Sequence, residues 1–164
     1  MEFKRFISEG LQLDTREELN RFLVEVFHDV LRSEEKYLRA LGYGDLSISE
    51  MHVIEACILC RAQGRDTAKG IAGLLDITPG SLTASVTVLE KKGYLLRCKD
   101  PSDLRRTHIT PTAKGLKADS AHRGIHRRMI DEIMEEISPQ EADVLLRALR
   151  TVAAFFSSER TKEA

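Results

Sequence analysis

Hydrophobic and polar positions between residues 67 and 93 follow the period of two short helices joined by a tight turn. Thr67 and Thr78 suit the starts of these helices, because a threonine hydroxyl accepts a backbone N–H bond there. Pro79 suits the first position of the second helix, where its missing N–H costs nothing, and Gly93 ends that helix. The positions expected to face inward are Ile71, Leu74 and Leu75 in the first helix and Leu82, Val86 and Leu89 in the second.

Longer helices are predicted on both sides of this pair by apolar stripes and by start signals. A stripe of Leu19, Phe22, Leu23, Val26 and Val30 marks the first long helix. Capping boxes at residues 47–50 and 138–141 open two others. The expected helices cover about 15–41, 48–62 and 113–137 and the segment from 138 onward, and the expected strands cover 94–98 and 107–110. Residues 1–13 are compatible with a short amphipathic turn or helix.

A helix pair followed by a hairpin with a basic tip is a winged helix, so the predicted fold is mainly α with a small β-hairpin wing. The outer side of the second helix carries small and hydroxyl-bearing residues, which allow a close approach to the major groove of DNA. An ordinary helical hairpin is the alternative. The residues predicted to contact DNA are Ser81, Thr83, Ser85 and Thr87 on the helix and Arg105 and Arg106 on the wing.

Composition and charge fit this interpretation. The 164 residues include 42% hydrophobic and 31% charged residues, with a net charge of −1. Residues 81–128 hold eleven Lys and Arg against four Asp and Glu, a net charge of +7, which leaves −8 for the remainder. A basic middle is the electrostatic footprint expected of a DNA-binding surface. No apolar run is long enough to span a bilayer and no signal peptide is visible, so a cytoplasmic location is expected.

The three cysteines agree with a reducing compartment. Cys57 and Cys60 have the CxxC spacing but fall within a predicted helix. A zinc ribbon needs a second such pair, so core packing is the favoured role. Cys98 lies in a predicted wing strand, which makes redox sensing an unfavoured function.

The order of elements, together with two short motifs, resembles the MarR family of transcriptional regulators. Asp103-x-Arg105 followed by residues 112–115 (TAKG) is similar to the wing signature of that family, and the resemblance runs from about residue 19 to residue 156. Leu104 and Pro111 depart from the family pattern. The resemblance implies a single domain over 1–164, with the winged helix-turn-helix core at 46–115 and dimerisation helices at 1–45 and 116–164. It also implies a homodimeric repressor on a palindromic operator.

A candidate sensor site comes from the histidines. His122 and His126 lie four residues apart on a predicted helix, which is a spacing that two ligands of one metal need, although such pairs are more often solvated. Their context resembles the zinc-uptake repressor branch of the family (AdcR/ZitR-like). That resemblance implies zinc as a corepressor of metal-uptake genes, one ion per subunit, with the ligands Glu35, His52, His122 and His126. His28 lies two turns before Glu35 on the same helix face and could substitute or assist at this site, although a surface or packing role is favoured. His108 is interpreted as a phosphate neighbour or a strand residue.

Two other functions remain as alternatives. In the first, a small aromatic or lipid-like ligand binds between the helices and releases DNA, and the histidines are incidental. In the second, the His and Glu residues form a metal-dependent active site. The sequence contains no GxSxG, HExxH or phosphate-binding glycine loop, and a closed four-ligand site leaves no position for substrate. An enzyme is therefore not expected.

Overall fold

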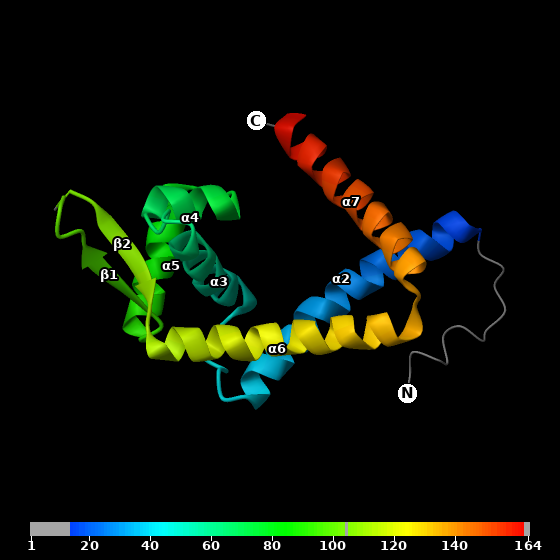
Figure 1. The fold of residues 1–164 in the computed structure, drawn as a ribbon, viewed down its shortest axis with the longest axis horizontal. Coiled ribbons are helices and arrows are strands. Elements are labelled where there is room, and N and C mark those ends of the chain that lie inside the picture. Colours follow the sequence, from blue (N-terminus) through cyan, green and yellow to red (C-terminus); the bar gives the residue numbers. More distant parts are fainter. Residues whose placement is uncertain (1–13, 104, 163–164) are drawn as a thin grey trace. The chain divides into compact units, whose positions relative to one another are not determined.

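The computed structural model describes residues 14–103 and 105–162 (Figure 1). It contains two compact units, with the boundary between Asp119 and Ser120. The elements are α2 (Thr15–Ala40), α3 (Ile48–Ala62), α4 (Ala68–Leu75), α5 (Pro79–Lys91), β1 (Leu95–Lys99), β2 (Thr107–Pro111), α6 (Ala113–Glu136) and α7 (Pro139–Lys162). This mainly helical chain with one two-stranded hairpin confirms the predicted fold class. The turn or helix expected over 1–13 lies outside the described residues, and the single-domain organisation stays a prediction.

The helix starts follow from capping groups that the sequence reveals. The Ser47 hydroxyl accepts the Glu50 N–H at 3.2 Å, while the Glu50 carboxylate accepts the Ser47 N–H at 2.9 Å. Thr78 accepts the backbone N–H of Ser81 at 3.1 Å, directly before Pro79. A reciprocal pair between Ser138 and Glu141 opens α7 in the same way. Each cap satisfies N–H groups that have no partner within their own helix, which is why the predicted starts are confirmed.

The core of the first unit lies among α3, α4, α5 and the hairpin. Leu82, Val86 and Leu89 of α5 are fully buried, as predicted. Ile71 is also buried, but the inward position expected for Leu74 is wrong, since its side chain is 42% exposed. Helix α4 is only eight residues long and presents Ile71 and Ala72 to the core, so Leu74 falls on its outer side.

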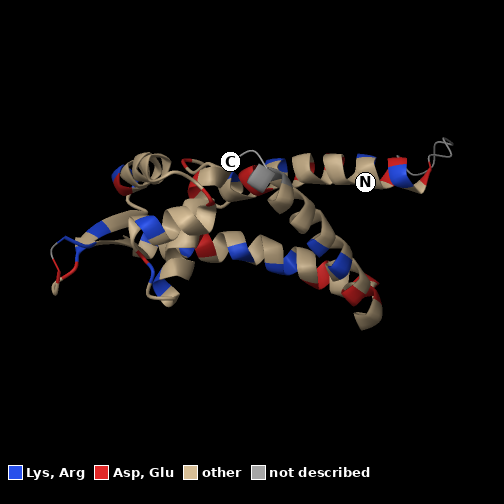
Figure 2. Cartoon of the chain, turned by 90° about the horizontal axis from the view of Figure 1, so that it is seen from above, with Lys and Arg blue, Asp and Glu red and all other residues tan. Residues whose placement is uncertain are grey.

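The hairpin pairs β1 with β2 in antiparallel register, from Leu95 opposite Pro111 to Lys99 opposite Thr107. Charged residues gather along its strands and at its tip (Figure 2). At its base, Thr112 donates its hydroxyl to the carbonyl of Gly93 at 2.7 Å and accepts the N–H of Gly115 at 3.1 Å. The Thr112 hydroxyl thereby links the start of α6 to Gly93, just after the end of α5.

Gly115 is required at this point by a close backbone approach. A Cβ atom at this position would lie 2.4 Å from the Tyr94 carbonyl oxygen. We expect Gly115→Ala to lower the free energy of unfolding by about 1–3 kcal/mol, the usual cost of overpacking. Gly73→Ala is the matched control, because nothing lies within 4 Å of its added methyl group, and it should raise stability by up to about 1 kcal/mol. Urea unfolding measures both, and equal stability of the two variants would contradict the close approach.

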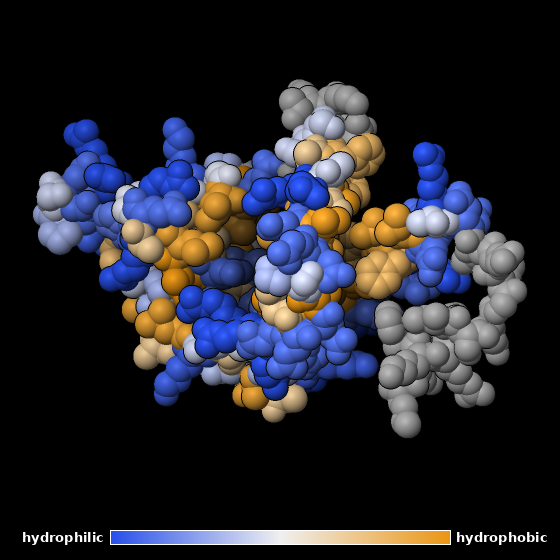
Figure 3. Space-filling model, turned by 45° about the vertical axis from the view of Figure 1, so that its right-hand side comes forward, coloured by the Kyte–Doolittle hydropathy of each residue, from blue (hydrophilic) through white to orange (hydrophobic). Residues whose placement is uncertain are grey.

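Both units leave large apolar side chains at the surface, some of which are visible in Figure 3. In the second unit, the exposed residues are Met129, Ile130 and Met134 of α6 and Val144, Leu145, Leu146, Leu149, Phe155 and Phe156 of α7. In the first unit, α2 exposes Leu19, Phe22, Val24, Phe27 and Leu31. Within the described residues, no single helix is long and apolar enough to cross a membrane, although α4 and α5 together meet that length and composition as a bent pair.

Candidate nucleic-acid interface and metal-binding residues

Helix α5, the recognition helix, is the second helix of the helix-turn-helix. Its outer residues Ser81, Thr83 and Thr87 are exposed, and Ser85 is half-buried. Three of these hydroxyls already donate hydrogen bonds one turn back along the helix. Thr83 donates to the Pro79 carbonyl at 2.8 Å, Ser85 to that of Ser81 at 3.2 Å and Thr87 to that of Thr83 at 2.8 Å. In this arrangement they offer lone pairs, which suit the amino groups of adenine and cytosine in the major groove.

Arg97 of β1 joins the wing to the recognition helix. Its guanidinium pairs with Glu90, and its backbone N–H donates to the same carboxylate at 2.9 Å. Its Nη2 atom lies 3.2 Å from both the Thr83 carbonyl oxygen and the Thr87 hydroxyl. Sequence reasoning counted Arg97 only as a positive charge, because nothing in the order of residues reveals this pairing. Arg97 therefore fixes the first wing strand against the helix that carries the predicted DNA contacts.

The wing tip holds its two predicted arginines in a defined turn. The Asp103 carboxylate accepts the Arg105 N–H at 3.0 Å, and the Asp103 carbonyl accepts the Arg106 N–H at 2.9 Å. Both arginine side chains are exposed, and neither forms an ion pair within the part of the chain that the structure describes. Two exposed cations at the end of a hairpin suit phosphate contacts or insertion into a minor groove. Their assignment to DNA stays a prediction.

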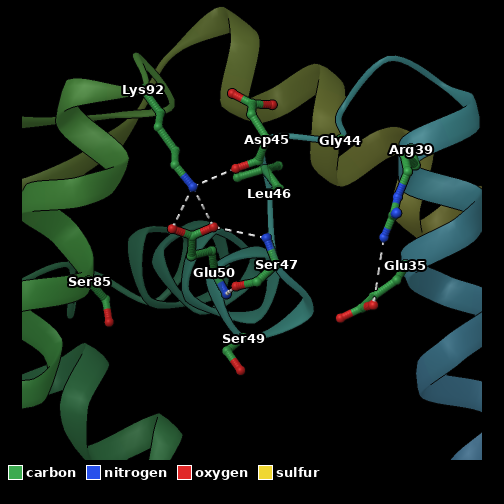
Figure 4. A pocket seen from close by; sticks show the side chains of 10 residues that line it. All are labelled: Glu35, Arg39, Gly44, Asp45, Leu46, Ser47, Ser49, Glu50, Ser85 and Lys92. Carbon is green, nitrogen blue, oxygen red and sulfur yellow. Dashed lines mark hydrogen bonds and ion pairs between the residues drawn. The ribbon is translucent and has the colours of Figure 1, made fainter.

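A polar pocket of about 600 Å³ lies between the end of α2, the start of α3 and the recognition helix (Figure 4). Lys92 extends into it and donates to both carboxylate oxygens of Glu50 at 2.8 Å. Partial burial by itself raises the pKa of Glu50, but hydrogen bonds from Lys92 and from the Ser47 N–H bring it below its ordinary value. Nearby, Asp45 accepts the Tyr94 hydroxyl at 2.7 Å. The end of the recognition helix is thus tied to the start of α3.

Glu35, the carboxylate predicted for metal binding, is preceded along the chain by Glu34, whose side chain is buried near His52. Glu35 is half exposed and pairs with Arg39 at 3.9 Å (Figure 4). Glu34, by contrast, is only 5% exposed. One of its oxygens and one ring nitrogen of His52 lie within 4.8 Å of each other. Successive helical residues point about 100° apart, so the two side chains leave α2 in different directions, and Glu35 lines the polar pocket beside the start of α3. Within the first unit, the structure thus brings Glu34 to His52.

The histidine pair predicted from its spacing does meet on one face of α6. The Nε2 atoms of His122 and His126 lie 3.3 Å apart, and the two rings are in edge contact with centroids 4.6 Å apart. His122 is only 1% exposed. It follows Ala118, a fully buried residue, by one helical turn on the same face.

The cysteines have the role expected of them. Cys57 and Cys60 are fully buried among the core residues of α3. Burial raises the pKa of Cys57 to about 12, so this thiol keeps its proton at neutral pH. Core packing is confirmed for this pair.

Comparison with known proteins places this geometry in a family. A MarR family model matches residues 46–107. The regulator SarZ of Staphylococcus haemolyticus is 28% identical over 118 residues, which is 72% of this chain and 77% of SarZ. The regulator YcgE of Bacillus subtilis is 28% identical over 150 residues, which is 89% of this chain and 94% of YcgE. These relatives are transcriptional regulators rather than enzymes, in agreement with the expectation from the sequence.

Solved structures give the same result. Streptococcus pneumoniae FabT in complex with DNA is 30% identical, with a TM-score of 0.77, and the match covers 87% of this chain and 98% of FabT. A Staphylococcus aureus MepR–DNA complex has a TM-score of 0.69 at 19% identity, covering 87% of this chain and 99% of MepR. At that identity the second likeness concerns the fold alone. Both neighbours are bound to DNA.

Proposed function

Because this chain belongs to the MarR family of DNA-binding transcriptional regulators, we propose that it is a homodimeric repressor whose affinity for its operator rises when each subunit binds one zinc ion. The observation that carries the metal proposal is the approach of His122 to His126. Two ligands on a tetrahedral zinc ion, with Zn–N bonds of about 2.0–2.1 Å, are about 3.3–3.4 Å apart. The two Nε2 atoms already have this separation, at 3.3 Å.

The remaining ligands of the proposed set come from the first unit. His52 is one of them, and the buried Glu34 takes the place of Glu35, because it is the carboxylate that approaches His52. Three imidazoles and one carboxylate make a closed, four-coordinate donor set, which leaves no position on the zinc ion for a substrate. Zinc at such a site supplies fixed coordination bonds and no reaction. The likeness of the histidine context to the zinc-uptake repressor branch supports zinc over other divalent metals.

Zinc binding and DNA binding are linked by mutual stabilisation. Zinc held by Glu34 and His52 together with His122 and His126 would tie the N-terminal helix and α3 to the helix that follows the wing. If this tied arrangement binds DNA better, zinc raises DNA affinity, and DNA raises zinc affinity by the same factor. The genes under control are then expected to be those of metal uptake, which are repressed when zinc is plentiful.

A second copy of this chain is the proposed cover for the apolar surfaces of α2 and α7. Each of these helices exposes at least five large apolar side chains, which is more than an isolated chain commonly leaves in water. A two-fold dimer presents two recognition helices to successive major grooves, so the operator should be roughly palindromic, with half-sites about one turn apart.

The metal content of the purified protein tests the proposal directly. A DNA duplex is first selected by the protein from a random library, and its binding is then measured by fluorescence anisotropy with zinc or with EDTA. About one zinc per subunit is expected, together with a DNA affinity about 5- to 150-fold higher with zinc. Absence of bound zinc, or an affinity indifferent to EDTA, would overturn the metal proposal. Release of the duplex by a small aromatic compound in EDTA would then favour the organic-ligand alternative.

The choice between Glu34 and Glu35 gives a sharper prediction. We expect Glu34→Gln to weaken zinc affinity by at least about 100-fold, since the loss of a direct ligand should exceed the loss of an outer partner. Glu35→Gln makes the same chemical change one residue away and should leave zinc affinity within about twofold of the parent. Competition with a zinc chelator measures both values. The reverse order of effects would assign the ligand to Glu35.

A further inference from the structure

His108, on β2 of the wing, lies between two carboxylates. Its Nδ1 atom is 2.8 Å from Asp66 Oδ1, and its Nε2 atom is 3.1 Å from Asp100 Oδ2. Asp66 belongs to the connection between α3 and α4, and Asp100 follows directly after β1. The imidazole therefore joins the wing to the base of the helix-turn-helix.

Simple hydrogen-bond accounting sets the charge of this histidine. A carboxylate oxygen only accepts, whereas a neutral imidazole has one N–H donor and one lone pair. Only the protonated ring, with an N–H on each nitrogen, donates to both Asp66 and Asp100. Accordingly, hydrogen bonds from the ring to Asp100 and then to Asp66 raise the pKa of His108 above its ordinary value of 6.5.

Backbone contacts bring β2 and this connection together as well. The Ile109 N–H donates to the Asp66 carbonyl at 2.8 Å, and Thr67 forms an isolated bridge with His108. Asp100 is itself held in place, since its Oδ1 atom accepts the Ser102 N–H at 2.8 Å. The other titratable groups around the bridge are Cys57 and Cys60 of α3, Arg65 next to Cys60, and Cys98 and Lys99 of β1.

We propose that His108 is a positioning residue for DNA binding. In its protonated form His108 fixes the wing against the helix-turn-helix, and the loss of this proton weakens DNA binding. The proposal rests on DNA binding by the family and is independent of zinc. A wing held in place before DNA arrives loses less conformational entropy on binding. Since the pKa of His108 is raised, the bridge is complete at any pH below the ordinary pKa of histidine. It is lost as the pH rises through the pKa that His108 has in the folded protein.

The Asp100→Asn variant tests whether the bridge needs a protonated His108, because it keeps the hydrogen bonds of the turn. The amide oxygen replaces Oδ1 and keeps the bonds to Ser102, while the amide NH₂ replaces Oδ2 and donates to a neutral imidazole. The wing then stays bridged without a proton. Asp103→Asn is the matched control, because it removes the same charge from the same turn but its carboxylate accepts the Arg105 N–H rather than contacting His108.

Two measurements test this proposal. The first is affinity for the selected duplex between about pH 6.5 and pH 9, with EDTA and again with saturating zinc. In the parent and in Asp103→Asn, log Kd should rise with pH, with a slope of at most about two because each subunit of the dimer contributes one linked proton. Asp100→Asn should be nearly flat. The second is an NMR titration of the imidazole without DNA or metal, with His108→Gln identifying the signal.

The NMR titration should show the pKa of His108 falling in Asp100→Asn and unchanged in Asp103→Asn. A parent and an Asp100→Asn variant with equal pH slopes, or with equal His108 titrations, would overturn the proposal. The titration uses neither zinc nor DNA, so its failure is distinct from a failure of the zinc-responsive function. Circular dichroism before each series excludes a variant that is unfolded.

Discussion

The double variant His122→Ala/His126→Ala is expected to lose zinc affinity by about 4,000-fold or more. A structural zinc site with four protein ligands binds with about 10–16 kcal/mol. Removal of half the ligands should forfeit about 5–8 kcal/mol, and each 1.4 kcal/mol is a factor of ten. The ordered core of the first unit does not include either histidine, so the helix-turn-helix should remain folded and should still bind the selected duplex.

The DNA affinity of this double variant provides the decisive comparison. It should equal that of the parent protein in EDTA, and it should not change when zinc is added. His28→Ala serves as the control, because His28 is an exposed histidine of α2, and this variant should keep both the zinc affinity and the zinc response. A double variant that still gains DNA affinity on addition of zinc would place the metal elsewhere.

Arg105→Ala should weaken binding to every duplex sequence by a similar factor. Each phosphate contact contributes about 0.9 to the slope of log affinity against log salt concentration. A dimer has two wings, so the slope should fall by about 1.8 when Arg105 contacts one phosphate in each subunit. Because the Arg105 side chain is exposed at the tip of the hairpin, its removal should not unfold the protein, and the loss of DNA affinity is then due to the lost contact.

Anisotropy titrations at several salt concentrations between about 50 and 200 mM measure this slope. Lys36→Ala is the matched control, since it removes one positive charge from an exposed position on α2. It should leave the slope unchanged. A normal slope in Arg105→Ala would move the wing contact to another residue, and a loss confined to one duplex sequence would indicate a base contact.

Much of the fold was predictable because its signals are local. Ser47 with Glu50, Thr78 with Pro79, and Ser138 with Glu141 satisfy free N–H groups within one turn, so neighbouring residues suffice to locate the helix starts. The inward positions of α5 follow from period alone. Leu74 was misplaced because a helix of eight residues has too few turns for its apolar face to be decided by period.

The burial of Glu34 was also within reach of the sequence. Val26 and Val30 belong to the predicted stripe of α2, and the next position of that stripe, four residues on, is Glu34. Leu38 continues it and is buried like Glu34. The stripe therefore predicts that Glu34 faces inward, whereas the assignment of the metal ligand to Glu35 rests on the family likeness and stays a prediction. The contacts of Arg97 and His108 are different, since both depend on partners from other elements, which no local pattern reveals.

The side chain of Arg97 limits how this protein can be re-engineered. It binds the Thr83 carbonyl, the Thr87 hydroxyl and the Glu90 carboxylate from outside the helix that carries them. A chimaera that exchanges only residues 79–91 for those of a relative would keep the backbone carbonyl at position 83, but it would lose the Thr87 hydroxyl and the Glu90 carboxylate wherever the relative has other residues there. Transfer of operator preference between regulators of this kind therefore requires the first wing strand to move together with the helix.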